Sequence, residues 1–286
     1  MILVFGKTGQ VARELAAYPD VICLDRAAAD LTDPAACAAA IHQHAPRAVI
    51  NAAAYTAVDK AEEEEALATL INGDSPGAMA VACAARNIPF LHVSTDYVFD
   101  GQGTQAWMPS DAIAPINAYG RSKAAGEAAI QVAARPGAQS AILRTSWVFS
   151  AHGANFVKTM LRLAESRDAV TVVDDQIGGP TSAKDIAATL MSMARAMQTD
   201  PQLGQGGKIY HYAGAPATSW KCFARETFTR AGKDVKVTGI PGSGYPTPAP
   251  RPLNSRLDCR ALETDFSITQ PDWRAALADV IKDLNP

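Results

Sequence analysis

Short apolar runs alternate with longer segments of mixed polarity along much of the chain. The apolar runs are typical of strands buried on both faces and lie at 1–5, 21–25, 48–51, 89–94, 140–146 and 169–173. Between them, apolar residues recur at the spacing of one helix face, as in 10–18 and 62–86. Strands that alternate with helices in this way predict an α/β fold built on a doubly wound, parallel sheet.

Several residues mark where the predicted helices begin and end. Asp33 followed by Pro34 predicts the N-cap and the first residue of a helix. Ser219 and Gly232 predict the start and the end of another. The sequence DSP at 74–76 falls inside a long helical pattern, and its proline predicts a break there.

Beyond residue 147 the alternation loosens. We therefore predict a first domain at 1–147, with later segments at roughly 169–200 finishing its sheet. Residues 148–286 are predicted to form mostly a smaller lobe, closed by an amphipathic C-terminal helix. The stretch 242–255 is rich in proline and glycine and has no periodicity. Such a stretch is more typical of a binding loop than of a linker.

Composition and charge exclude several classes of protein. Of the 286 residues, 48% are hydrophobic and 19% are charged, and the net charge of −3 with scattered basic residues disfavours a nucleic-acid-binding surface. No apolar run approaches the roughly 20 residues of a membrane span, and no basic region of a signal peptide begins the chain. The five cysteines are odd in number and widely spaced, which predicts neither disulfides nor a zinc site. We expect a cytoplasmic protein with reduced cysteines and no membrane partner.

A glycine-containing turn follows the first predicted strand. In the sequence GKTGQVA, Gly6 and Gly9 have the spacing that lets a backbone approach a pyrophosphate at a helix N-terminus. Asp25 ends the second strand, where an acid would meet the adenosine ribose of NAD, whereas the adjacent Arg26 would hold the 2′-phosphate of NADP. Asp30 is a second acidic candidate, beside the adenine, or only a loop cap. The first domain is therefore predicted to bind NADH or NADPH, with a plain strand-to-helix turn as the alternative.

Three polar side chains are predicted to meet at the carboxyl edge of the sheet, where doubly wound folds bind ligands. Thr95 ends the fourth strand, and Tyr119 and Lys123 lie one turn apart on the next helix. A phenol has a pKa near 10, and lowering it by about three units takes about 4 kcal/mol. An ammonium about 4 Å away supplies that much only in a dehydrated crevice. The hypothesis is that Tyr119 donates a proton, supported by Lys123 and Thr95; a chance pair on a helix is the alternative.

Longer stretches of the chain resemble the extended short-chain dehydrogenase/reductase family. They are GKTGQV, NAAAYTAVDKAE, STDYVFDG, YGRSKAAGE, RTSWVF, DQIGGPT and TPAPRPLNSRLD, which run from residue 6 to residue 258. The resemblance implies a Rossmann-type sheet with a smaller C-terminal lobe that binds the substrate. It also implies an oxidoreductase that uses NADPH or NADH to reduce the C4 ketone of dTDP-4-dehydro-L-rhamnose, in the synthesis of a cell-surface polysaccharide precursor.

The same resemblance assigns roles to individual residues. Tyr119 would be the proton donor, Lys123 its partner and Thr95 the hydroxyl that tunes it. Tyr119 and Lys123 are also predicted to contact the cofactor, with Lys123 holding the nicotinamide ribose. The residues implied to line the cofactor are Gly9, Gln10, Val11, Asp25, Asp30, Leu31, Ala53, Ala54 and Tyr55. Those implied to meet the sugar nucleotide are Thr56, Val58, Thr95, Asp96, Tyr97, Tyr119 and Trp147, with Arg251, Asn254 and Ser255 helping to hold the diphosphate and thymidine. Trp147 and Val58 could instead be core residues.

Other functions remain open at this point. Related dehydratases carry Thr-Asp-Glu, whereas this chain has Thr95, Asp96 and Tyr97, so the base needed for elimination is missing. A sugar-nucleotide epimerase and a non-catalytic regulatory subunit of a methionine adenosyltransferase are further alternatives, the latter disfavoured by the retained catalytic set. Some relatives are described as magnesium-linked dimers that use glutamates; Glu14 lies at a plausible position, but the C-terminal helix has only Asp279 and Asp283. We predict no metal site, and a monomer or a homodimer.

Overall fold

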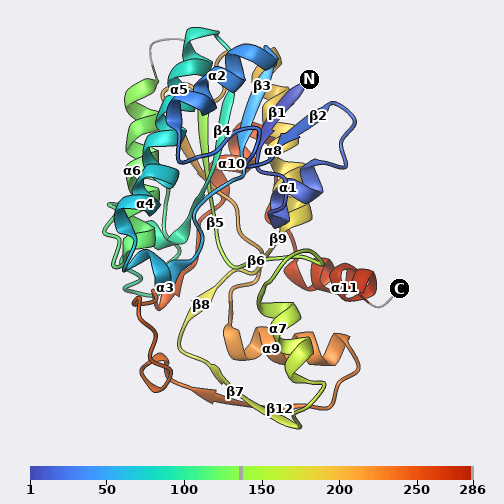
Figure 1. Cartoon of the computed structure of the whole chain (residues 1–286). Coiled ribbons are helices and arrows are strands. Elements are labelled where there is room, and N and C mark those ends of the chain that lie inside the picture. Colours follow the sequence, from blue (N-terminus) through green and yellow to red (C-terminus); the bar gives the residue numbers. More distant parts are fainter. Residues whose placement is uncertain (135–137, 285–286) are drawn as a thin grey trace.

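A six-stranded parallel sheet forms the centre of the computed structural model, which describes residues 1–134 and 138–284 (Figure 1). The strands stand in the order β10-β5-β4-β3-β1-β2, and every neighbouring pair is parallel. They are β1 (Ile2–Phe5), β2 (Val21–Leu24), β3 (Ala48–Asn51), β4 (Phe90–Thr95), β5 (Ser140–Thr145) and β10 (Lys208–His211). The predicted doubly wound α/β fold is confirmed.

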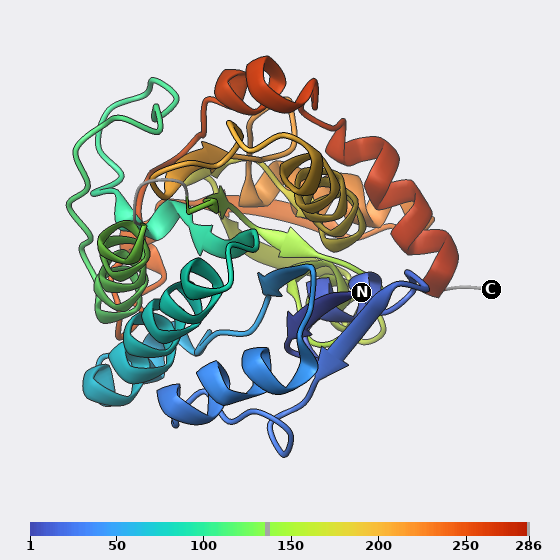
Figure 2. The same ribbon diagram turned by 90° about the horizontal axis from the view of Figure 1, so that it is seen from above.

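Helices cover both faces of the sheet, as the view from above shows (Figure 2). One face carries α1 (Gln10–Leu15) and α8 (Ala183–Thr199), with α10 (Arg260–Phe266) beside β10. The other carries α2 (Pro34–His44), α5 (Ser75–Ala85) and α6 (Ala118–Ala133). Because side chains alternate along a strand, Ile2 and Val4 join the core on the first face, and Leu3 and Phe5 join the core on the second.

The predicted helix boundaries are confirmed with one difference. Asp33 accepts a hydrogen bond from the Ala36 N–H, and Ser219 caps α9 (Trp220–Arg230) in the same way. The expected break at 74–76 is instead a single π-helical turn, which joins α4 (Glu65–Thr69) to α5. Pro76 has no N–H to donate and its ring crowds the preceding turn, so the wider turn accommodates it without ending the helix.

A smaller lobe lies beyond the carboxyl ends of the central strands (Figure 1). Its short strands are β6 (Val148–Phe149), β7 (Ala169–Val173), β8 (Ile177–Gly178), β9 (Thr181–Ser182), β11 (Thr218–Ser219), β12 (Lys236–Ile240) and β13 (Asn254–Ser255). Helices α7 (Phe156–Leu163) and α9 pack over β7 and β12 around Met160, Val172 and Phe228. Helix α11 (Trp273–Leu284) packs against the side of the lobe, and its Trp273 side chain joins the hydrophobic core there.

Residues 169–200 were expected to finish the central sheet, and this prediction is wrong for β7, the strand predicted at 169–173. β7 pairs only with β12, in the lobe, and β10 is the sixth strand of the sheet. Ala169 and Thr171 are exposed while Val170 and Val172 are buried, so β7 covers a core on one face only. Helix α8 does pack on the sheet, as part of the first core. In the described ranges, no helix combines the length and the apolar character that crossing a bilayer requires.

Candidate functional site

The turn after β1 is shaped to admit a ligand. Gly6 has a φ of 108°, and a Cβ atom there would lie 3.3 Å from the Ala53 side chain. Gly9 precedes α1, and a Cβ atom there would meet nothing within 4 Å. No side chain caps the first turn of α1. Close packing at Gly6 and open space at Gly9 fit a dinucleotide whose pyrophosphate lies against the backbone of this turn.

The two candidate acids at the end of β2 are both paired with cations. Asp25 lies 3.2 Å from the Lys7 ammonium, and the hydrogen bond from Lys7 lowers the pKa of this carboxyl. Asp30 accepts hydrogen bonds from the Thr32 N–H and from Arg26, and these lower its pKa. Carboxylates and cations therefore share one exposed rim, which suits either a ribose diol or a 2′-phosphate.

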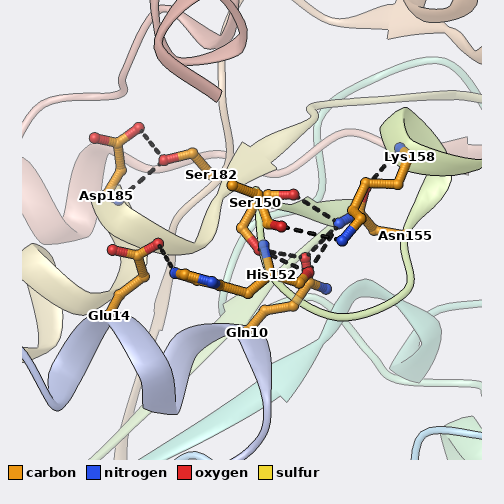
Figure 3. Close-up of polar contacts among 9 residues, drawn as sticks. Gln10, Glu14, Ser150, His152, Asn155, Lys158, Ser182 and Asp185 are labelled. Carbon is orange, nitrogen blue, oxygen red and sulfur yellow. Dashed lines mark hydrogen bonds and ion pairs between the residues drawn. The ribbon is translucent and has the colours of Figure 1, made fainter. Parts of the chain in front are cut away.

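Three residues predicted to line the cofactor have side chains occupied elsewhere. Val11 and Leu31 are buried in the two cores on either face of the sheet. The Gln10 oxygen accepts hydrogen bonds from the Ser150 hydroxyl (2.8 Å) and from the Asn155 amide (3.0 Å), as Figure 3 shows. The backbone groups of these residues remain available to a cofactor. The side-chain hydrogen bonds of Gln10 also connect the glycine turn to the lobe.

A separate cavity of about 260 Å³ lies between α1, α8 and α11. Glu14, Asp185, Asp279 and Asp283 line it, and none of the predicted catalytic residues does. Glu14 pairs with His152 at 3.3 Å, and Asp185 accepts the Ser182 hydroxyl (Figure 3). In the part of the chain that the structure describes, no three potential ligands are grouped closely enough to hold a metal ion.

Helix α6 brings Tyr119 to the end of β4. The Asn117 side chain caps α6 by accepting the Gly120 N–H and also donates to the Pro250 carbonyl in the proline-rich loop. A side chain at Gly120 would overlap the Tyr97 carbonyl oxygen, so glycine is required for this close approach. The Tyr97 and Tyr119 rings meet edge to face with centroids 5.6 Å apart. The packing of α6 thus explains a glycine next to the candidate proton donor.

Thr95 connects Tyr119 to an acid. The Thr95 hydroxyl donates to Asp96 Oδ1 (3.0 Å) and accepts from the Tyr97 N–H (3.2 Å). Burial raises the pKa of Tyr119 to about 12, the Asp96 charge adds to this, and a hydrogen bond with Thr95 opposes it. The phenol is therefore protonated at neutral pH, as a proton donor must be.

Two buried polar atoms at this edge have no partner within the described residues. They are Asp96 Oδ2 and the Thr145 hydroxyl, and Thr145 pairs with Thr95 across the sheet. Burial raises the pKa of Asp96 to about 6, although hydrogen bonds from Ser255 and Thr95 lower it. Buried oxygens without partners are costly, so this pair of atoms is suited to hydrogen-bonding a ligand that enters beside Tyr119.

Replacing Asp96 should change how stability depends on pH. The native carboxyl holds its proton up to about pH 6, whereas its ordinary pKa is 3.8. Folding stability is therefore lost as pH rises through this window, by about 3 kcal/mol. Asp96→Asn removes this loss. Its free energy of unfolding relative to wild type should rise by roughly that amount between pH 3.5 and pH 7.5 in urea titrations. A difference that stays constant with pH would contradict the raised pKa.

Lys123 shares a face of α6 with Tyr119, but its nitrogen contacts β4. Nζ donates to the Val93 carbonyl (2.7 Å) and lies 2.9 Å from His92 Nε2. Within the described residues no hydrogen bond joins Lys123 to Tyr119, and burial lowers the pKa of Lys123 to about 7. The structure therefore does not support the hypothesis that a permanent Lys123 charge lowers the phenol pKa.

The loop after β3 reaches the same edge. Tyr55 packs against the same small cluster as Tyr119, around Ala118, and its hydroxyl donates to Glu64 (2.8 Å). Ala53 and Ala54 are half-buried and Thr56 is exposed. Small or partly exposed residues here leave room for a ligand above the Gly6 turn. Val58 begins the short helix α3 (Val58–Ala61) and is half-buried.

The lobe residues predicted to meet the sugar nucleotide are brought together in part. β13, which holds Asn254 and Ser255, pairs with β8 in the DQIGGPT stretch. Ser255 lies beside Asp96, whereas the Asn254 amide is used to hold the Gln105 carbonyl (2.8 Å). Arg251 pairs with Asp59 at 2.8 Å, at the start of α3.

Trp147 has a structural role at the lobe junction. It adopts a φ of 49°, unusual for a bulky residue, and its ring stacks on Trp220 with centroids 3.6 Å apart. A side chain at Gly178 would crowd this ring, at 2.7 Å. Trp220 therefore covers one face of the Trp147 ring, and that face cannot contact the sugar nucleotide. This favours the alternative that Trp147 is a packing residue.

Sequence reasoning missed the buried polar residues that support the site. Glu127 lies one turn after Lys123 and accepts both nitrogens of the Arg144 fork (2.9 and 2.6 Å) and the Ser94 hydroxyl (2.6 Å). His92 and Asn51 lie on adjacent strands, 3.1 Å apart. A lone histidine in the otherwise apolar run PFLHVS was the one signal that could have identified this cluster.

Comparisons with known proteins agree with this geometry. A family model described as RmlD substrate binding domain matches residues 1–285. A Sinorhizobium fredii protein named dTDP-4-dehydrorhamnose reductase is 45% identical over 95% of this chain and 93% of its own length. A crystal structure of such a reductase from Clostridium acetobutylicum is 34% identical, with a TM-score of 0.90 and coverage of 100% and 99%. One from Bacillus anthracis, in complex with NADP, is 31% identical, with a TM-score of 0.90 and coverage of 99% and 98%.

Proposed function

The chain belongs to the RmlD substrate binding domain family, and we propose from this premise that its site reduces the C4 ketone of dTDP-4-dehydro-L-rhamnose to dTDP-L-rhamnose. It is an NAD(P)H-dependent reductase of dTDP-rhamnose synthesis, like its relatives. The observation that carries the site assignment is the meeting of Thr95, Asp96 and Tyr119 at the carboxyl edge of β4, beside the Gly6 turn.

Tyr119 is the proton donor in this proposal. The bound dinucleotide would supply the hydride that turns the ketone into an alkoxide. Tyr119 is half-buried, and its raised pKa keeps it protonated at neutral pH, with a hydrogen bond to Thr95. An alkoxide is a stronger base than a phenolate, so the proton moves from Tyr119 to the sugar oxygen. Thr95 orients the phenol: its own proton is held by Asp96, so its oxygen is left to accept a hydrogen bond from Tyr119.

The lobe and the loops hold the sugar nucleotide. Asp96 Oδ2 accepts a sugar hydroxyl, which gives this buried atom its missing partner. Arg251 is a planar fork of donors, suited to a diphosphate, and is only 19% exposed while paired with Asp59. Ser255 lies beside Asp96 on β13. Binding the substrate would exchange some of these internal contacts for contacts with the nucleotide.

Elimination and a purely regulatory role fit the site less well. Tyr97 stands where a dehydratase needs a carboxylate, and its ring packs on Tyr119. Burial raises the pKa of Tyr97, so it is a poor base at neutral pH. A purely regulatory role does not explain why Tyr119 meets the buried Thr95 and Asp96, or why Asp96 Oδ2 has no partner among the described residues.

The direct test is oxidation of NADPH and NADH by the purified chain with dTDP-4-dehydro-L-rhamnose, followed by identification of dTDP-L-rhamnose. Turnover that depends on the sugar nucleotide supports the proposal. Folded protein that binds NADP but shows no turnover with either cofactor would contradict it. We propose that the chain works in the cytoplasm as a monomer or homodimer, which sedimentation at assay concentration would establish for the assembly.

Arg26→Ala should separate the two cofactors. If Arg26 meets the 2′-phosphate, the variant loses a charge-assisted hydrogen bond of about 1.5–3 kcal/mol, and kcat/KM for NADPH falls by about 10- to 100-fold. NADH lacks this phosphate, so its kcat/KM should change less than twofold. Arg47→Ala, an exposed arginine at the opposite end of the strands, is the matched control. Equal losses with both cofactors would show that Arg26 does not recognise the phosphate.

A further inference from the structure

The inference concerns a buried hydrogen-bonded row that runs from β3 through β4 to α6. It consists of Asn51, His92 and Lys123, which are 0%, 0% and 1% exposed. The Asn51 amide nitrogen lies 3.1 Å from His92 Nδ1, and His92 Nε2 lies 2.9 Å from Lys123 Nζ. Both ring nitrogens of one histidine therefore face nitrogen atoms of other side chains. With water excluded, the protons in this row have few possible positions.

The orientation of Asn51 is fixed by the backbone. Its side-chain oxygen accepts the Ala53 N–H at 3.1 Å, so its NH2 group is the end that faces His92. An NH2 group only donates, and His92 Nδ1 must therefore be the bare, accepting nitrogen. Turning the amide around would place its NH2 against the Ala53 N–H, with two donors facing one another. A neutral imidazole carries one proton, so in this row it lies on Nε2.

The proton on Nε2 determines the state of the lysine. An ammonium group has three donors and no acceptor, so it cannot accept the His92 Nε2 proton. A neutral amine has a lone pair that can, and it keeps a hydrogen for the Val93 carbonyl at 2.7 Å. From this geometry we infer that His92 is a positioning residue that holds Lys123 as a neutral amine by donating its Nε2 proton to Lys123 Nζ.

The surrounding charges agree with this arrangement. Burial lowers the pKa of Lys123 to about 7 and lowers that of His92 well below 6.5. On α6 the neighbouring ionisable groups are Tyr119, which is protonated, and Glu127. The Glu127 charge opposes this effect and raises the Lys123 pKa, but it is also met by the two-pronged contact with Arg144 from β5 and by Ser94 from β4. Among the described residues of β3, the uncharged Asn51 reaches the row.

As a statement about catalysis, the inference rests on the proposed function. Lys123 then carries no fixed charge in the resting site, and its protonation near neutral pH becomes part of the pH dependence of the reaction. The protonation states themselves are properties of the protein alone. They can be tested on protein without substrate, so failure of the proposed reaction and failure of this inference are distinguishable.

The test is NMR of the full chain labelled with 15N-histidine and with 13C at the lysine ε carbon. The 15N shifts of His92 distinguish a protonated from a bare ring nitrogen, and we expect Nε2 protonated and Nδ1 bare. The ε-carbon shift of Lys123, assigned as the signal lost in Lys123→Met, should titrate near pH 7. A proton on His92 Nδ1, or a Lys123 midpoint above pH 9, would overturn the inference with wild-type protein alone.

His92→Gln tests the causal link. A glutamine amide can place its oxygen where Nε2 was, and it then accepts from an ammonium instead of donating to an amine. The Lys123 midpoint should rise by at least one pH unit, a tenfold change in its proton affinity. His42→Gln, an exposed position on α2, is the matched control and should leave the midpoint unchanged. A properly folded His92→Gln protein with an unchanged midpoint would show that His92 does not set the state of Lys123.

Discussion

Tyr119→Phe should lose between about 10²- and 10⁴-fold in kcat, the usual contribution of a positioned general acid. The variant removes one oxygen from a half-buried ring that otherwise packs on Tyr97 unchanged. The alkoxide formed by hydride transfer would then have no proton donor at bonding distance. KM for the sugar nucleotide should change little, because the proposed function places its diphosphate and thymidine against the lobe. Steady-state kinetics with NADPH, over a range of pH, measures both quantities.

Tyr210→Phe is the matched control for this prediction. Its hydroxyl is also removed from the interior, where it donates to Asp265 (2.6 Å) at the far edge of the sheet. We expect this control to keep kcat within about twofold while losing about 1 kcal/mol of stability with its hydrogen bond. If Tyr119→Phe instead retained more than a tenth of wild-type kcat, another group would have to protonate the sugar oxygen. Asp96, connected to the same site through Thr95, would then be the first candidate.

Much of the central fold could be predicted because its first and third strands are apolar on both faces. β1 and β3 are buried at every residue, and the helix start at Asp33 is set by a local hydrogen bond that sequence spacing reveals. β10 escaped prediction because it is only four residues long and begins with an exposed lysine, Lys208. β7 resembles a core strand in composition, and its place in the lobe depends on its long-range partner β12, which no local pattern identifies.

The site shows the same division between local and long-range information. The i, i+4 spacing placed Tyr119 and Lys123 on one face of α6, but it could not show where the lysine nitrogen ends. That depends on His92 and the Val93 carbonyl, about 30 residues away in sequence. Likewise, Asp96 was assigned as a substrate contact, while its unpartnered oxygen and raised pKa follow from burial beneath the lobe. Residue type and spacing identified the candidates, and tertiary contacts determined their protonation.

Breaking the buried ion pair beneath the site should be strongly destabilising. Arg144 and Glu127 are 1% and 2% exposed and make two hydrogen bonds to each other. Arg144 also lies 4.9 Å from the centre of the Phe99 ring. Breaking a buried pair leaves an uncompensated charge, so Arg144→Met alone should cost about 3–5 kcal/mol. Urea denaturation, with the midpoint and slope fitted together, measures this loss.

The double variant gives the sharper result. Removing both charges, in Arg144→Met with Glu127→Leu, leaves no buried ion, and much of the stability should return. The exposed pair Arg121 and Glu65 also makes two hydrogen bonds, but water reaches both side chains, so Arg121→Met should cost at most about 1 kcal/mol. If Arg144→Met cost no more stability than Arg121→Met, burial would not make the Arg144–Glu127 pair more costly to break than the exposed pair. A double variant no more stable than Arg144→Met would instead mean that Ser94 and the His211 contact, 3.4 Å from Arg144, depend on the charges being present.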